Sequence, residues 1–191
     1  MGQKFYRCIK LLLLYVMTTI INAPLIYAIP EGFVYLKEID PTIIENLRYF
    51  SNENFIGRKI EGYKANRAIL TYEAAKALSK VQQELLKDGY CLVIYNAYMP
   101  KRTVEFFKRW RENINDQTQR EKYYPAINKA DIFKLGYLAE RANYNRGSTV
   151  DVTIIKRGNK PKNKPVFSNR LLKDNSWIPF LDDGTVDMRT L

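Results

Sequence analysis

One stretch of the chain repeats its apolar residues with the period of an α-helix. Between Thr71 and Lys87 they recur at spacings of four, three and four, as Ala74, Leu78, Val81 and Leu85. Residues with these spacings form one stripe along a helix. Thr71 is a residue type that caps helix N-termini, and the Gly89 that follows is a type that ends helices. The pattern therefore predicts a helix over residues 71–87 that packs on the core through this stripe.

A second stretch alternates with the period of a β-strand. Over residues 150–154 aliphatic and polar side chains alternate. Val150, Val152 and Ile154 are aliphatic, and Asp151 and Thr153 between them are polar. Successive side chains of a strand point to opposite faces of the sheet. We expect the aliphatic residues to face the core and Asp151 to face a cleft, and a solvent-facing Asp151 is the alternative.

Three further segments complete the predicted fold. Residues 33–39 and the apolar run 90–95 are typical of strands, and residues 103–111 have the pattern of a helix. Helices and strands in this order, with no internal repeat, indicate a single α+β domain. We expect a small mixed or antiparallel sheet with packed helices.

The remaining segments are mostly polar. Residues 113–124 are expected to form a surface connection, residues 127–142 have no clear pattern, and residues 156–165 form a basic loop with little to pack. Asp182, Asp183 and Asp187 suggest either a calcium loop or a tight Asp-Gly turn. The spacing does not follow the EF-hand pattern, so we favour the turn.

The N-terminus has the pattern of a secretory signal peptide. Lys4, Arg7 and Lys10 precede an apolar run over residues 11–21, and small residues follow at Ala23 and Ala28. We expect cleavage after Ala28 and export of residues 29–191. An uncleaved anchor is the alternative, but the run is short for a stable membrane span.

Charge and composition limit the function further. The net charge is +11, and removal of the three leader cations leaves 11 − 3 = +8. Such a charge suits an anionic surface, but no nucleic-acid motif accompanies it, and we expect no nucleic-acid partner. The chain has no histidine, which excludes hydrolases that use histidine as base. Cys91 lies in an apolar run and is expected to be an inert core residue.

Several motifs, in order along the chain, resemble those of the D-alanyl-D-alanine dipeptidases, the VanX-like zinc D,D-peptidases. They are Asn46-Leu-Arg-Tyr49, Asn54-Phe-Ile-Gly57, Gly89–Pro100, Phe107–Trp110, Tyr123-Tyr-Pro125, Gly136-Tyr-Leu-Ala139, Asn145–Thr153 and Asp182–Met188. The resemblance implies a zinc D,D-peptidase-like α+β domain that hydrolyses the dipeptide D-Ala-D-Ala in peptidoglycan turnover. It also implies a periplasmic location for the exported chain.

The resemblance also says which residues belong to the site. Two family zinc ligands lie in Ser-x-His-x-x-Gly-x-x-x-Asp, where this chain keeps Gly147 and Asp151 but has Ala142 and Tyr144 at the Ser and His positions. The family's transition-state arginine corresponds to Met99. The family's Glu-x-x-His motif, with the third ligand and the general base, would follow Leu191, so the chain is expected to be a C-terminally truncated copy.

These departures predict an inactive copy. Catalytic zinc takes three protein ligands and a water, and Asp151 is the only ligand position that survives. We therefore expect no bound zinc and no catalytic residue, with D-Ala-D-Ala as the ancestral substrate. Two alternatives remain: a non-catalytic binder of D-Ala-D-Ala termini, and a basic protein that binds anionic surfaces. The oligomeric state is left open.

Overall fold

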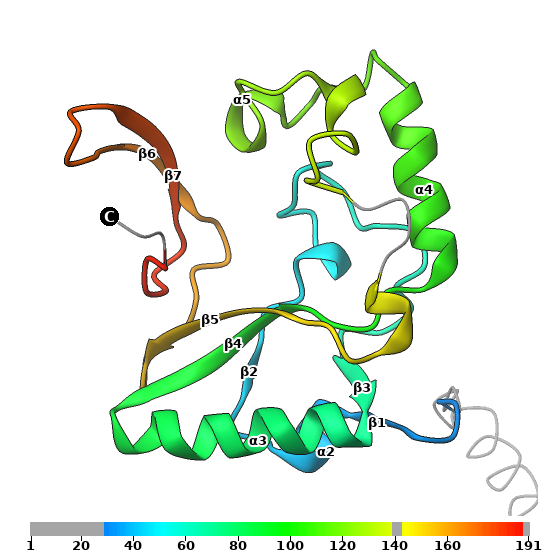
Figure 1. The fold of residues 1–191 in the computed structure, drawn as a ribbon, viewed down its shortest axis with the longest axis vertical. Coiled ribbons are helices and arrows are strands. Elements are labelled where there is room, and N and C mark those ends of the chain that lie inside the picture. The colour runs from blue at the N-terminus through cyan, green and yellow to red at the C-terminus, as the bar shows by residue number, and fades with distance from the viewer. Residues whose placement is uncertain (1–28, 139–142, 189–191) are drawn as a thin grey trace, which may run out of the picture. The chain divides into compact units, whose positions relative to one another are not determined.

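The computed structural model describes residues 29–138 and 143–188, and the chain divides into two compact units, residues 1–30 and 31–191. The leader expected over residues 1–28 lies outside the described residues. The second unit is an α+β domain, as predicted, and Figure 1 shows its helices and strands. No helix in the described part of the chain is long and apolar enough to cross a membrane.

The central sheet has three strands in the order β2-β4-β5. The middle strand β4 (Tyr90–Asn96) pairs in parallel with β2 (Ile44–Glu45) and antiparallel with β5 (Asp151–Lys156). Four consecutive residues of β4, residues 91–94, are buried, because elements cover both faces of this strand. Cys91 is among them, which confirms its assignment to the core.

Helix α3 (Tyr72–Lys87) confirms the predicted helix and its cap, since the Thr71 hydroxyl accepts the Ala74 N–H. The predicted stripe is wrong at one position. Val81 is 49% exposed, whereas its neighbour Gln82 is fully buried. The Gln82 amide donates to Thr42 Oγ1 and its carbonyl accepts the Leu92 N–H, so hydrogen bonds turn the helix to bury a polar residue.

The alternation predicted for β5 holds only in part. Val150 and Ile154 pack on the cluster beneath α3, as expected, and Thr153 lines a cleft. Val152 is 44% exposed instead of buried. The pairing register shifts between Ile94 and Asn96, so Tyr95 and Asn96 of β4 together oppose Asp151, and this bulge bends β4 beside the start of β5.

The strand predicted over residues 33–39 is wrong after Tyr35. β1 (Phe33–Tyr35) pairs antiparallel with β3 (Ile69–Thr71), and α2 (Leu36–Ile39) follows at once. The Leu36 N–H donates to Ala68 O and the Leu36 carbonyl accepts the Asp40 N–H. Leu36 is thereby fully buried while residues 37 and 38 stay exposed, a spacing that a helical turn provides and a strand does not.

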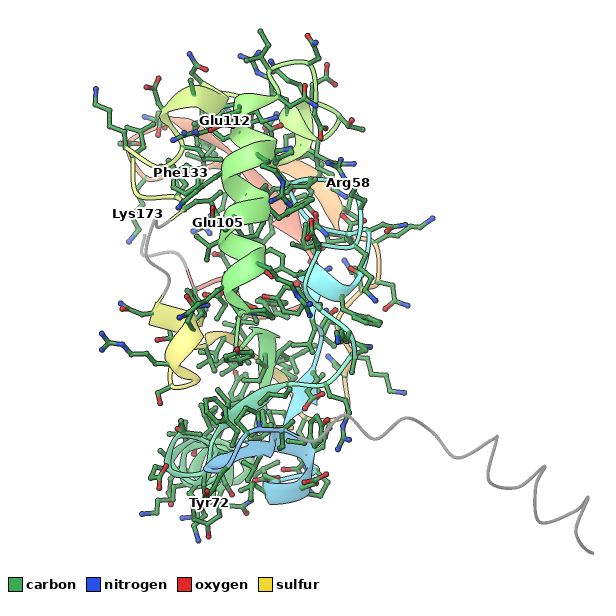
Figure 2. The ribbon with its side chains drawn as sticks, turned by 90° about the vertical axis from the view of Figure 1, so that its right-hand side faces the viewer. Arg58, Tyr72, Glu105, Glu112, Phe133 and Lys173 are labelled. Carbon is green, nitrogen blue, oxygen red and sulfur yellow. The ribbon has the colours of Figure 1, made fainter. Side chains whose placement is uncertain are left out.

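Helix α4 (Lys101–Glu112) agrees with the helix predicted over residues 103–111. It buries one face in a second cluster, made of Ile56, Ile60, Met99, Val104, Phe107, Trp110, Tyr124 and Ile132. Figure 2 shows α4 with Glu105 and Glu112 along it and with Phe133 and Arg58 on either side. This cluster supports the aromatic side of the cleft described below.

Short elements connect these parts. They are η1 (Arg48–Phe50), α5 (Arg120–Tyr123), η2 (Lys129–Asp131) and η3 (Asn143–Arg146). The segment 113–124 is mostly exposed, as predicted, although Tyr124 is buried. The basic loop after β5 is also exposed, and it leads into a hairpin that the sequence pattern did not reveal, β6 (Val166–Leu171) and β7 (Trp177–Asp182).

Candidate functional site

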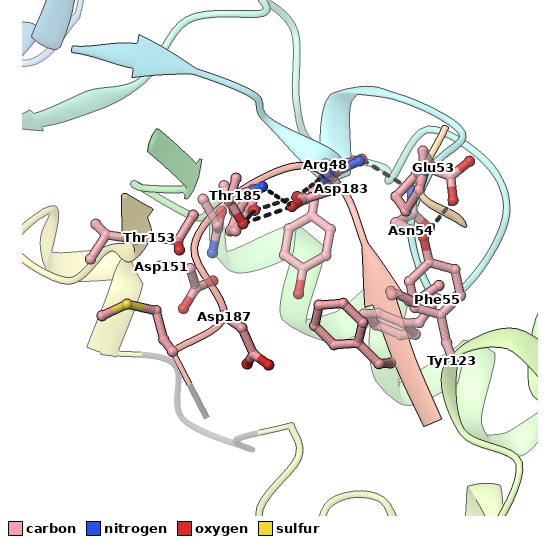
Figure 3. A pocket seen from close by; sticks show the side chains of 18 of the residues that line it. Arg48, Glu53, Asn54, Phe55, Tyr123, Asp151, Thr153, Asp183, Thr185 and Asp187 are labelled. Carbon is pink, nitrogen blue, oxygen red and sulfur yellow. Dashed lines mark hydrogen bonds and ion pairs between the residues drawn. The ribbon is translucent and has the colours of Figure 1, made fainter. Parts of the chain in front are cut away.

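A cleft of about 560 Å³ opens at one end of the central sheet. Its walls come from β4 and β5, from η1 and the turn after it, and from β7 and the turn after it. Figure 3 shows the polar side chains that converge on it, among them Arg48, Glu53, Asp151 and Asp183. The volume lies within the range of small-molecule sites.

Asp151 lines this cleft at the start of β5, which confirms the direction predicted for its side chain. The Tyr144 hydroxyl donates to Asp151 Oδ1 over 2.5 Å. Burial raises the pKa of Tyr144, and the hydrogen bond to Asp151 and the charge of that carboxylate raise it further. The phenol is therefore held in its protonated, donating form.

Two more phenols lie close to Asp151. Burial raises the pKa of both Tyr49 and Tyr63, and the nearby Asp151 carboxylate adds to the shift in each. The Tyr63 hydroxyl donates over 2.9 Å to Asn96, the residue paired with Asp151 across the β4–β5 ladder. Three neutral phenols thus lie around Asp151.

Met99 is close to Tyr144 but does not line the cleft, although the resemblance assigns its position to the site as that of the family's arginine. Its side chain is 5% exposed and belongs to the cluster beneath α4. The Met99 N–H donates to Tyr144 O over 3.3 Å, and its carbonyl accepts the Asn145 side-chain amide. An apolar thioether is stable in this core, where it fills space among aromatic rings.

An ion-pair network closes another side of the cleft, and sequence reasoning did not find it. Arg48 Nη2 lies 2.6 Å from Asp183 Oδ2, which also accepts the Tyr95 hydroxyl, and Thr185 Oγ1 donates to Asp183 Oδ1 over 2.7 Å. Burial works to raise the pKa of Asp183, but these hydrogen bonds outweigh it and lower the pKa. Burial and the bond to Asp183 raise the pKa of Tyr95 to about 12.

Glu53 forms a smaller network at the aromatic side of the cleft. Its carboxylate accepts the Tyr123 hydroxyl over 2.7 Å and pairs with Lys122. Burial works to raise the pKa of Glu53, but the two hydrogen bonds prevail and lower it. Each acidic side chain of these networks is thus already engaged by donors from the protein.

The predicted Asp-Gly turn is confirmed at residues 182–185. Asp182 Oδ1 accepts the Gly184 N–H over 2.8 Å, and Asp183 Oδ1 accepts the Thr185 N–H. Across residues 29–138 and 143–188, no three His, Cys, Asp or Glu side chains are placed to share a metal ion. Ala142, the residue at the family's Ser position, lies outside the described residues.

The site can also be tested as a zinc centre by its chemistry. Asp151 could supply one carboxylate oxygen, and Tyr144, which is hydrogen-bonded to it, would have to lose its proton to coordinate a metal. The pKa of that phenol is raised, so deprotonation is disfavoured. The described residues around Asp151 therefore do not fit catalytic zinc, which takes three protein ligands.

Comparisons with known proteins agree with the α+β architecture. The model of the Peptidase_M15 family, described as D-ala-D-ala dipeptidase, matches residues 30–161. The chain belongs to this family.

Three relatives carry the name D-alanyl-D-alanine dipeptidase. One from Enterococcus faecium is 34% identical over 125 residues, and one from Enterococcus faecalis is 37% identical over 124 residues. One from Streptomyces coelicolor is 34% identical over 122 residues. The matches cover 64–65% of this chain and 60–62% of the relatives, so the chain spans about three fifths of their length.

Proposed function

We propose that this chain is a D-Ala-D-Ala dipeptidase domain that has lost zinc-dependent hydrolysis. The observation that carries the proposal is the hydrogen bond from Tyr144 to Asp151. At the position of a family zinc ligand, a protonated phenol donates to the one carboxylate that remains. A donor aimed at the carboxylate competes with any cation for the same oxygen.

Met99 supports the same proposal. The family position holds an arginine that offsets charge in the transition state, and loss of one such group costs about 10²–10³ in rate. A thioether has no N–H to donate. Met99 is also buried outside the cleft, so its backbone position does not aim a side chain at a bound peptide.

The test is an assay of the full chain for zinc content and for D-alanine release from D-Ala-D-Ala, with and without added zinc. We expect no stoichiometric zinc and no release above that of an Asp151→Ala variant. Zinc-dependent release that Asp151→Ala abolishes would overturn the proposal. Circular dichroism of both proteins establishes that they are folded.

A second candidate is a non-catalytic binder of D-Ala-D-Ala termini, which the cleft volume favours. Titration calorimetry with the dipeptide separates the two. Heat of binding without D-alanine release supports the binder, and an Asp151→Asn variant shows whether the cleft carboxylate takes part. Absence of binding excludes the non-catalytic binder and favours the first candidate, the dipeptidase domain that has lost hydrolysis.

We further propose that the chain is exported, as the positive leader and apolar run suggest. Cell fractionation and N-terminal sequencing test this. A shortened chain beginning at Ile29 outside the cytoplasm is the expected result. A full-length cytosolic product contradicts it.

A further inference from the structure

The positive charge of the chain is concentrated in one exposed segment, residues 156–177. This segment has seven cations, Lys156, Arg157, Lys160, Lys162, Lys164, Arg170 and Lys173, and one acid, Asp174. Its net charge is therefore 7 − 1 = +6, compared with +11 for all 191 residues. More than half of the excess charge comes from about a ninth of the chain.

Most of these cations face water. Lys162 pairs with Asp182 and Arg170 pairs with Asp187. The other five are exposed, and no ion pair is formed by them within the described ranges. Among the described residues, the loop before β6 contributes no side chain to the hydrophobic clusters of the core, so its positive charge is not explained by core packing.

The hairpin that follows the loop has an exposed apolar face. Leu171 pairs with Trp177 across β6 and β7, and Phe167 lies on the same face four residues before Leu171. Phe167 is 45% exposed, Leu171 50% and Trp177 65%. Three large apolar side chains on one face of a two-stranded hairpin are costly in water and indicate a surface that is covered.

We propose that residues 156–177 bind the surface of an anionic lipid membrane. The cations of the loop attract lipid phosphates, and Phe167, Leu171 and Trp177 enter the interfacial region, where tryptophan is favoured. The apolar face distinguishes this partner from nucleic acid, for which a basic loop alone suffices. The inference goes beyond the proposed function and does not depend on the cleft.

Trp177 provides a direct test, because the chain has two tryptophans and the other, Trp110, is buried. The full chain is mixed with vesicles of phosphatidylcholine alone or with added phosphatidylglycerol. We expect a blue shift of tryptophan emission only with the anionic vesicles, lost in a Trp177→Ala variant. The leader contains no tryptophan, so its own affinity for lipid does not produce the shift.

Two charge variants complete the test, with affinity measured by vesicle sedimentation. One replaces Lys156, Arg157, Lys160 and Lys164 by Gln; the control replaces the exposed Lys76, Lys80, Lys101 and Lys134 by Gln. Each cation near an anionic surface contributes roughly fivefold, so four contribute up to about 600-fold, and two of the four already give about thirtyfold. We expect at least about a thirtyfold loss in the first variant, and a much smaller loss in the control. Equal losses, an unchanged emission spectrum, or emission that is already blue without vesicles would overturn the proposal. Binding to duplex DNA that leaves Trp177 emission unchanged would also overturn it.

Discussion

The Tyr144 hydroxyl donates a 2.5 Å hydrogen bond to Asp151 Oδ1. The two residues come from different elements, η3 and β5, and the turn at Gly147 brings them together. Under the proposed loss of the metal site, a phenol stands where the family has an imidazole, and it donates a hydrogen bond to the carboxylate where an imidazole would donate an electron pair to zinc. On that proposal the phenol also engages the carboxylate that is the other ligand position.

Tyr144→His tests this relationship. The variant places an imidazole beside Asp151, and we expect zinc affinity to rise by at least about tenfold, because a second ligand joins the carboxylate. Two protein ligands remain fewer than the three of catalytic sites, so no D-alanine should be released. Titration calorimetry with zinc gives the affinity.

Tyr144→Phe is the matched control, since it removes the same hydroxyl without adding a ligand, and its zinc affinity should stay near that of the parent. Adding Met99→Arg to Tyr144→His should still give no turnover. It should also destabilise the fold by several kcal/mol, because position 99 is buried among apolar side chains. A double variant that releases D-alanine would contradict the proposed loss of the metal site.

Substitutions at Gln82 and Val81 test, through the stability of the fold, which face of α3 packs on the core. Gln82→Leu removes both hydrogen bonds of a fully buried side chain and leaves the Leu92 N–H without its acceptor, so we expect a loss of about 2–4 kcal/mol. Val81→Ala, one position away, should change stability by less than about 0.5 kcal/mol because the side chain is exposed. Urea unfolding measures both. Equal effects would mean that α3 packs through the stripe predicted from its sequence.

Gln82 and Val81 also show which features of the fold the sequence pattern predicts and which it does not. Periodicity predicted α3, β4 and α4 because local spacing and capping determine where a regular element begins and ends. It failed at Gln82, since the rotation of α3 depends on Thr42 and Leu92, which other elements supply. Hydrophobicity alone does not reveal that a polar side chain has partners in the core.

The candidate site divides in the same way. Asp151 was found from alternation along one strand, and its direction into the cleft is confirmed. Arg48 and Asp183 were missed because they are 135 residues apart in sequence, and no local pattern connects them. The hairpin β6–β7 was missed because nearly all of β6 is exposed, so its sequence does not alternate between buried apolar and exposed polar residues.

Asp183 makes a prediction about pH. Its pKa is lowered in the fold, below the value of about 3.9 for an unfolded chain. Its contribution to stability is therefore present above pH 4 and is lost as the pH falls through the lower, folded pKa. We expect Asp183→Asn to cost about 3 kcal/mol at pH 7, since it removes one member of a largely buried pair with Arg48.

Urea unfolding at pH 7 and at pH 3 checks this prediction. The difference between Asp183→Asn and the parent should shrink at the lower pH, because pH 3 lies below the unfolded pKa of about 3.9 and the unfolded parent then takes up a proton at this carboxyl. Asp88→Asn, which removes an exposed carboxylate at the end of α3, serves as the control and should cost little at either pH. A stability difference between variant and parent that stays constant with pH would show that Asp183 stabilises the fold through packing and not through its charge.

Gly147 tests the turn that brings Tyr144 to Asp151. Its φ is +74°, and a Cβ there would overlap the Phe33 ring, while its carbonyl accepts the Thr71 N–H over 2.8 Å. Gly89 has a similar φ of +78°, but a Cβ there would have no atom within 4 Å.

Left-handed backbone costs an alanine about 1–2 kcal/mol, and we expect Gly89→Ala to lose that amount of stability. Gly147→Ala should lose at least about 2 kcal/mol more, because Phe33 must also move. Thermal unfolding of the two variants measures the difference. Equal losses would show that the Phe33 side chain moves aside without a cost in stability. The turn at Gly147 would then depend on its backbone conformation and not on packing against β1.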